Sequence, residues 1–214
     1  MTQKLIIVGA GGNSKVILDS IFTRKQILSE DLEILGFLDD DNTKKEIKGY
    51  PVLGPISLII DYIGQSNLAF VDGIGANSIR KLLYEKYSNV SWYTLVHPSA
   101  ILGSGVVLGE GTIVMPGVII NVDTKVGKKA LINTGAILEH DNKISDFTHI
   151  ASGVTTAGNV HIGELTMLGT GTKVIQGIHI GENTMVGAGA TVISDIPSHC
   201  TAVGVPARVI KKND

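Results

Sequence analysis

The 214-residue sequence is poor in several residue types, and each shortage excludes a class of protein. Cys200 is the only cysteine, which excludes an internal disulfide and a cysteine-based zinc cluster. Aromatic residues make up only 5% of the chain, whereas glycines number 26. A core without many aromatic rings must be assembled from small and β-branched side chains.

Long apolar runs and an excess of one charge are also missing. The longest apolar runs, such as residues 5–8 and 117–120, fall far short of the ~20 residues that span a bilayer. The N-terminus lacks the charged-then-apolar pattern of a signal peptide. The formal net charge is −2, so no basic footprint indicates nucleic acid. We therefore expect a soluble cytoplasmic protein with no membrane or nucleic-acid partner, folded as one large domain or two small ones.

A repeat of six residues runs through the second half of the chain. Residues 96–191 divide into sixteen hexads without an insertion. The first position is Val, Leu or Ile except at Thr156, and the fifth is Ala, Val or Thr except at Asn142 and Ile178. This period fits short strands and corners stacked in a parallel β-helix, with first and fifth side chains inside and glycine near the corners. Three hexads form one triangular coil, so sixteen form just over five coils.

The first half instead alternates strand-like and helix-like segments. We expect strands near residues 4–9, 34–41, 68–75 and 91–96, one helix after residue 15 and another over 77–87. This order is typical of a small parallel sheet of Rossmann type. The expected domains are therefore an α/β domain over residues 1–95 and an all-β domain over residues 96–214.

Two loops of the first domain are candidates for ligand contacts. The turn at Gly9, Gly11 and Gly12 could bring backbone N–H groups to a phosphate at a helix N-terminus, although Ser14 replaces the last glycine of the dinucleotide fingerprint. Asp39 and Asp40 close the second strand, where carboxylates often meet ribose or base donors. A bare structural turn and a solvated loop are the respective alternatives.

The hexads, and the ending Gly204-Val-Pro-Ala-Arg208, resemble the hexapeptide-repeat acyltransferases. The branch of that family which contains bacterial nucleotide-aminosugar N-acetyltransferases and sialic acid O-acetyltransferases shows the same order of segments: IIVGAGGNSKVILDSI, ILGFLDDD, GYPVLGP, GIGANSIRKLLYEKY and HPSAIL. The resemblance implies a left-handed coil, acetyl-CoA as co-substrate, a homotrimer, and a Rossmann-like domain that holds a nucleotide sugar rather than NAD. Some members carry histidine where this chain has Asn13, another expected substrate contact.

Acetyl transfer needs a base for the acceptor's proton and donors for the developing oxyanion. Since the repeat lacks a usable cysteine or a Ser-His-Asp arrangement, direct transfer is the simpler mechanism. His140 lies in the polar segment 139–142, which we interpret as a break in the repeat. The resemblance to this family implies that His140 is the general base and that Asp141 orients it. A solvated corner of the coil is the alternative.

A column of sixth-position residues predicts a subunit interface. Stepping by one coil gives Ile113, Leu131, His149, Met167 and Met185, which lie outside the core yet are mostly apolar. The second positions of the same hexads are small, which favours close approach of another backbone on this face. His149 would then lie in the cleft between subunits where the family places acetyl-CoA, or be an interface histidine without a ligand. By resemblance, Gly158 lies near the thioester, and Thr170 and Ala188 line the pantetheine channel.

The leading functional hypothesis is N-acetylation of a nucleotide-linked amino sugar in bacterial surface glycan biosynthesis. There are two alternatives: O-acetylation of a sialic acid, and a non-catalytic trimeric scaffold. The sequence does not distinguish O-acetylation from the leading hypothesis. His161 and His179 stack one coil apart, but Lys143 occupies the next place, where a catalytic zinc would need a third imidazole. We therefore expect no metal.

Overall fold

The structure, a computed structural model, describes residues 1–212, and the chain divides into two compact units, Met1–Pro98 and Ser99–Asp214. The division falls three residues beyond the boundary expected from the sequence.

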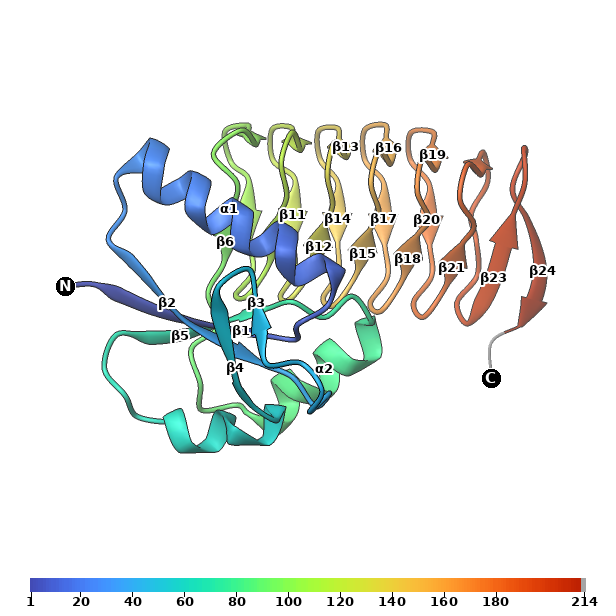
Figure 1. Ribbon diagram of the computed structural model, residues 1–214. Coiled ribbons are helices and arrows are strands. Elements are labelled where there is room, and N and C mark those ends of the chain that lie inside the picture. The colour runs from blue at the N-terminus through green and yellow to red at the C-terminus, as the bar shows by residue number, and fades with distance from the viewer. Residues whose placement is uncertain (213–214) are drawn as a thin grey trace. The chain divides into compact units, whose positions relative to one another are not determined.

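The first unit is an α/β fold around one sheet with strand order β3-β4-β2-β1-β5 (Figure 1). All neighbouring strands are parallel except β3 and β4. Its elements are β1 (Gln3–Val8), α1 (Gly12–Leu28), β2 (Leu32–Leu38), β3 (Glu46–Ile47), β4 (Tyr50–Gly54), the 3-10 helix η1 (Ile56–Tyr62), β5 (Leu68–Asp72), α2 (Asn77–Lys86) and β6 (Leu95–Val96).

The centre of this sheet explains where the first ligand candidates lie. β1 pairs with β2 on one side and β5 on the other, and its last four residues are fully buried, as expected of a central parallel strand. Gly9 follows with φ +95°, a backbone conformation that favours glycine, and the chain turns into α1. The loop before α1 therefore lies at the carboxyl ends of β1, β2 and β5.

Two features of the first unit differ from the sequence prediction. The sequence analysis did not predict β3, β4 or η1. Ile59 of η1 belongs to the buried core with Phe70 and Trp92. The expected strand over 91–96 is reduced to a bridge between Trp92 and Phe70 and to the short β6.

The second unit is a left-handed parallel β-helix, in which short strands stack coil upon coil from β7 to β22 (Figure 1). We name its three sheets by the first strand that each has within this unit: the β7 face (β7-β10-β13-β16-β19-β22), the β8 face (β8-β11-β14-β17-β20) and the β9 face (β9-β12-β15-β18-β21-β23-β24). β23 and β24 close the coil as an antiparallel pair.

The strand bounds follow the hexads. The β7 face holds β7 (Ile101–Leu102), β10 (Ile119–Ile120), β13 (Ile137–Leu138), β16 (Thr155–Thr156), β19 (Lys173–Val174) and β22 (Thr191–Val192). The β8 face holds β8 (Val107–Leu108), β11 (Lys125–Val126), β14 (Lys143–Ile144), β17 (His161–Ile162) and β20 (His179–Ile180). The β9 face holds β9 (Ile113–Val114), β12 (Leu131–Ile132), β15 (His149–Ile150), β18 (Met167–Leu168), β21 (Met185–Val186), β23 (Cys200–Val203) and β24 (Arg208–Lys212).

The interior of the coil confirms the inward positions read from the repeat. First-position side chains from Val114 to Val192 and fifth-position side chains from Thr112 to Ala190 are buried. The hydroxyls of Thr112, Thr124 and Thr166 donate to backbone oxygens of the next coil, as Thr124 Oγ1 does to the Glu139 carbonyl at 2.8 Å. The buried Thr156 hydroxyl, in contrast, has no hydrogen-bond partner within residues 1–212. The fourth residue of each hexad, from Gly105 to Gly189, has a positive φ. This conformation accounts for the glycines at the corners, and Asp141 adopts it with φ 60°.

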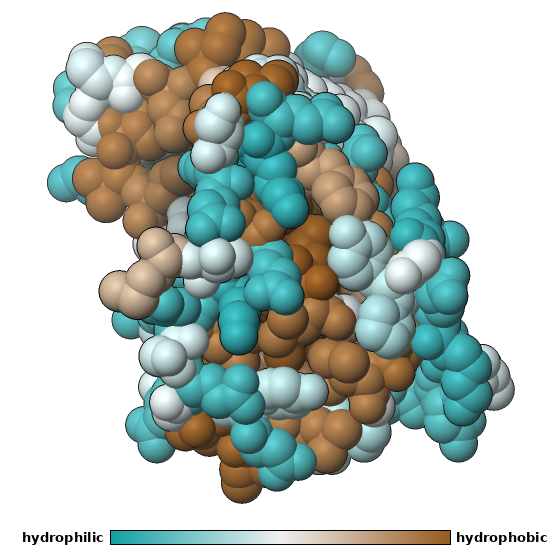
Figure 2. Space-filling view, turned by 60° about the vertical axis from the view of Figure 1, so that its left-hand side comes forward, coloured by the Kyte–Doolittle hydropathy of each residue, from teal (hydrophilic) through white to brown (hydrophobic). Residues whose placement is uncertain are grey.

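The surface of both units mixes polar and apolar residues. Large exposed apolar side chains include Ile27, Leu82, Ile101 and Ile210. Figure 2 shows hydrophobic areas that are separated by hydrophilic side chains on one face. Within residues 1–212, no helix has the length and apolar character needed to cross a membrane.

Candidate active site

His140 and Asp141 form a pair at one corner of the coil. They belong to the turn between β13 and β14, and this corner, which joins the β7 face to the β8 face, is called the His140 corner below. His140 Nδ1 lies 2.8 Å from Asp141 Oδ2, and both side chains are more than half exposed. Asp141 accepts the Nδ1 hydrogen, which leaves Nε2 as the free acceptor of the ring. The arrangement suits a general base that receives a proton from a ligand in solvent reach.

The next coil places Gly158 directly beside the imidazole ring. A Cβ at Gly158 would lie 2.5 Å from His140 Cε1 and 2.6 Å from Nε2, closer than real Cβ contacts. Among the third-position residues from Ser104 to Ala188, Gly158 is the one glycine, so the corner itself does not require glycine. The glycine is therefore explained by the ring, which occupies the space of a side chain.

Asn142 does not break the coil, contrary to our interpretation of the sequence. Its side chain is fully buried and points inward like every other fifth-position residue. Its Nδ2 donates to the carbonyls of Glu139 and of Ala157, and its Oδ1 accepts the Val160 N–H at 3.1 Å. The amide thus substitutes for threonine as an internal link between coils, and only the outer residues of the segment are available for chemistry.

His149, Thr170 and Ala188 lie elsewhere on the prism. His149 begins β15 on the β9 face, with its Nε2 3.5 Å from the amide nitrogen of Asn133. Thr170 and Ala188 follow β18 and β21, at the corner where the β9 face meets the β7 face. Because the His140 corner is opposite the β9 face in a triangular coil, one chain does not bring these three residues to His140.

The apolar column around His149 is only partly available to a second subunit. The strands align Ile113, Leu131, His149, Met167 and Met185 in register, as expected. Ile113 and Leu131 are each 2% exposed within the chain itself, so the prediction of an outer surface was wrong for them. Met185 is 49% exposed and offers apolar surface at the other end of the column.

In the first unit, the glycine-rich loop leads into the N-terminus of α1. Neither Gly11 nor Gly12 has an atom within 4 Å of a Cβ built on it. Ser14, which replaces the third glycine of the fingerprint, is buried against Gly73 and its hydroxyl donates to the Gly73 carbonyl at 3.4 Å. Asn13 donates to the same carbonyl at 3.4 Å. The space over Gly11 and Gly12 is therefore open for a ligand to approach the backbone.

The two carboxylates of the second strand have different partners. Asp39 accepts the Ala10 N–H at 2.6 Å and the Asp41 N–H at 2.8 Å, and it pairs with Lys44 at 3.2 Å. Desolvation raises the pKa of Asp39, but these hydrogen bonds and Lys44 outweigh it and hold the pKa below its usual value. Asp40 is exposed and uses Oδ1 to accept the Ile56 N–H. Asp39 thus holds the loop, whereas Asp40 is open to a ligand.

Comparison with known proteins agrees with both units. The family described as the PglD N-terminal domain matches residues 4–87. The acetyltransferase domain of PglB from Neisseria gonorrhoeae FA1090 is 30% identical, with a TM-score of 0.91 over 98% of this chain and 100% of that chain. A variant of perosamine N-acetyltransferase from Caulobacter crescentus, in complex with CoA and GDP-perosamine, is 34% identical, with a TM-score of 0.89 over 98% of this chain and 97% of that chain.

The chain belongs to the hexapeptide-repeat acetyltransferases, in the branch of nucleotide-aminosugar N-acetyltransferases. It is also 39% identical to the UDP-N-acetylbacillosamine N-acetyltransferase of Bacillus subtilis (strain 168) over 114 residues, which are 52% of this chain. That alignment covers 50% of the Bacillus enzyme. Among the described residues, this acetyltransferase has no group of three or more His, Cys, Asp and Glu side chains that could hold a metal ion.

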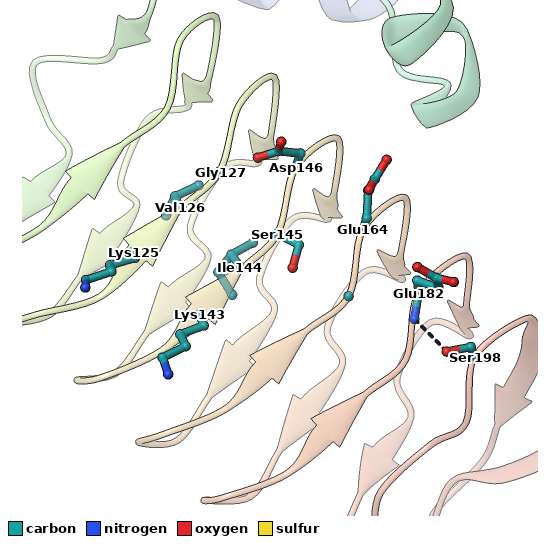
Figure 3. Close-up of a pocket in the computed structure, with 11 residues that line it drawn as sticks. Lys125, Val126, Gly127, Lys143, Ile144, Ser145, Asp146, Glu164, Glu182 and Ser198 are labelled. Atoms are coloured by element: carbon teal, nitrogen blue, oxygen red, sulfur yellow. Dashed lines mark hydrogen bonds between the residues drawn. The ribbon is translucent and has the colours of Figure 1, made fainter.

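One groove of the acetyltransferase lies on the β8 face, and its lining does not include His140. It measures about 720 Å³, with Lys125 and Lys143 along one side and Asp146, Glu164 and Glu182 along the other (Figure 3). Its lining includes Gly127, Ser145 and Gly163, three of the small second-position residues that we assigned to the His149 face. That assignment was wrong, because the second residue of a hexad precedes the corner and the sixth follows it. A Cβ at Gly163 would lie 2.4 Å from the Glu182 nitrogen, so coil stacking alone explains the glycine.

The stacked histidines of the β8 face have a separate environment. The rings of His161 and His179 have centroids 4.3 Å apart, and Lys143 is the next residue in register. Burial lowers the pKa of His161, and the nearby His179 and Lys143 lower it further. His161 Nε2 is buried with no hydrogen-bond partner in residues 1–212. His161 is therefore a poor candidate for the base.

Sequence reasoning missed Arg80, a buried cation behind the first-unit loops. Arg80 is 2% exposed and donates to the Gly75 carbonyl at 2.8 Å and to Asn77 Oδ1 at 3.0 Å. Burial lowers its pKa to about 10, although Asp72 opposes this shift. Arg80 thereby fixes the loop that follows β5. The sequence offered one signal, an arginine in the first turn of an otherwise amphipathic helix.

Proposed function

We propose that this protein transfers the acetyl group of acetyl-CoA to the amine of a nucleotide-linked amino sugar. The observation that carries the proposal is the His140–Asp141 pair beside Gly158, in a chain that matches N-acetyltransferases over nearly its whole length. The perosamine enzyme holds CoA and GDP-perosamine, and the PglB domain is also known in complex with acetyl coenzyme A. These complexes support the same two substrates here.

His140 acts as the general base of a direct transfer. Asp141 keeps the hydrogen on Nδ1, so Nε2 accepts a proton from the acceptor amine as its nitrogen bonds to the thioester carbon. The carbon–sulfur bond breaks, and the imidazolium returns the proton to the departing thiolate. The Gly158 N–H is the donor for the negative charge that develops on the carbonyl oxygen.

The coenzyme contacts other than those at the His140 corner come from another copy of the chain. His149, Thr170 and Ala188 lie on or beside the β9 face, opposite the His140 corner. A homotrimer in which the β9 face of one copy approaches the His140 corner of the next gives each cleft both groups. The coenzyme then lies between copies, and three equivalent sites result.

The first unit binds the nucleotide part of the acceptor. A Cβ at Gly11 or Gly12 would meet no atom within 4 Å, so a ligand has room at the N-terminus of α1, where a pyrophosphate is favoured. The backbone N–H groups of Gly11, Gly12 and Asn13 are its donors. Gly9 makes the turn, Asp39 holds it, and Asp40 accepts a hydrogen bond from ribose or base. A passive trimeric scaffold would need neither this open loop nor the His140 pair.

Release of coenzyme A with a panel of nucleotide amino sugars and sialic acids tests the proposal. His140→Ala should lower turnover by about 10²–10⁴-fold, the usual effect of removing a general base, with acetyl-CoA binding unchanged. His179→Ala, an exposed histidine on the β8 face, is the control and should retain full activity. Full activity of His140→Ala would move the base elsewhere, and turnover of sialic acids alone would replace the amine by a hydroxyl acceptor.

A further inference from the structure

Most second positions of the hexads hold small residues. A Cβ at Gly109 would lie 2.5 Å from backbone atoms of the next coil, and one at Gly181 would lie 2.3 Å away. From Gly103 to Ile193 these positions hold mostly Gly, Ala or Ser, and Glu139 is the one charged residue among them. The column of Glu139 itself accommodates larger residues such as Asn121 and Ile175, so the charge of Glu139, rather than its size, sets it apart.

Glu139 is held in place immediately next to the proposed base. Its Oε2 accepts a hydrogen bond from Asn121 Nδ2 at 2.9 Å, and Asn121 is the second-position residue one coil earlier. The Glu139 side chain is half-buried, whereas His140 beside it is exposed. An amide that serves one oxygen of a carboxylate leaves the other oxygen free for a donor.

The column that contains Glu139 changes polarity at this coil. Asn121 and Glu139 are polar, and the following coils place Ala157, Ile175 and Ile193 at the same position. Ile175 is 39% exposed and Ile193 is 46% exposed. The edge of the β7 face thus offers hydrogen bonds before His140 and apolar surface after it. This order suits a polar acceptor on the earlier coils and the pantetheine arm on the later ones.

We propose that Glu139 binds the acceptor amine and selects amines over hydroxyls, an inference that rests on the proposed function. An amine has enough N–H bonds to donate one to His140 Nε2 and another to Glu139. A hydroxyl has a single O–H, which it donates to His140. The Glu139 carboxylate then faces the hydroxyl oxygen and receives no hydrogen bond from it. The carboxylate also stabilises the positive charge that develops on nitrogen as it bonds to the thioester carbon.

Steady-state kinetics of Glu139→Gln test this role. Glutamine keeps the shape and can still accept the Asn121 hydrogen bond, but it removes the charge. Loss of a charge-assisted hydrogen bond should lower kcat/KM for the amino-sugar acceptor by about 10- to 100-fold. The KM for acetyl-CoA and the melting temperature should not change. Glu182→Gln, an exposed carboxylate at another corner, is the matched control and should behave like the parent.

A second measurement compares each amino sugar with its analogue that carries a hydroxyl in place of the amine. The preference for the amine should fall in Glu139→Gln and fall less in Asn121→Ala, which leaves the charge but not its support. If the parent is active and Glu139→Gln has an unchanged kcat/KM for the amino sugar and an unchanged preference for the amine, the role of Glu139 is overturned. A parent that acetylates no amine at all would instead overturn the proposed function.

Discussion

Gly158→Ala tests whether the geometry around His140 performs the chemistry. The added methyl group would lie 2.5 Å from His140 Cε1, whereas ordinary contacts begin at 3.4 Å. The imidazole must therefore retreat by about 1 Å or rotate away, because the backbone of the coil is fixed by stacking on both sides. Either movement disturbs the 2.8 Å contact between Nδ1 and Asp141.

The size of the effect follows from this displacement. A misplacement of about 1 Å at a reacting group costs on the order of 10²-fold in rate, or about 2.7 kcal/mol of transition-state stabilisation. The fold should hardly respond, since the obstructing ring is more than half exposed and is free to move into solvent. The free energy of unfolding should change by less than about 0.5 kcal/mol.

Kinetics and thermal melting of three variants separate these effects. We expect Gly158→Ala to lose activity without a change in melting temperature, and His140→Ala to lose at least as much activity. The double variant Gly158→Ala/His140→Ala should be no worse than His140→Ala, because the alanine at 158 acts through the ring. Glu182→Ala changes an exposed third-position residue at the corner between the β8 and β9 faces and is the control.

Two results would refute the reasoning. Full activity of Gly158→Ala would show that the position of the ring does not matter. Additive losses in the double variant would show that residue 158 acts independently of His140, for example only through its own N–H group.

Three further predictions concern other parts of the chain. Gly11→Val should weaken nucleotide-sugar binding by about 10-fold in calorimetric titration with unchanged melting, since no atom lies within 4 Å of its Cβ, and equal binding would exclude a ligand there. Met185→Asp should dissociate the proposed trimer in sedimentation, whereas Lys173→Glu on the β7 face should not; a monomeric parent would contradict the interface. The unfolded chain binds a proton at His161 more readily than the folded chain does, so stability falls as the pH drops below about 6.5, and His161→Phe should flatten the decrease in melting temperature between about pH 7 and 5.5. Equal slopes would exclude that contribution.

The repeat allowed the fold of the second unit to be predicted because the period acts locally. Inward first and fifth positions, as at Val114 and Thr124, are required wherever the coil runs, so every hexad repeats the same signal. The parallel sheet of the first unit was predicted for a similar reason, since Leu5–Val8 form a continuous apolar run typical of a central strand. The family resemblance added the handedness and the roles of His140 and Asp141, which no period contains.

Only the tertiary structure decided which of these residues share a surface. Each hexad crosses a corner, so its second and sixth residues lie on different faces, and the small residues belong beside Lys143 rather than beside His149. Asn142 interrupts the sequence repeat but not the coil, because its amide forms hydrogen bonds between coils in place of a threonine hydroxyl. The Asp39 carboxylate already accepts a hydrogen bond from the loop before α1, which the sequence did not indicate. The face on which a residue lies and the partners of its side chain depend on contacts between segments distant in sequence. A local sequence pattern carries no information about those contacts.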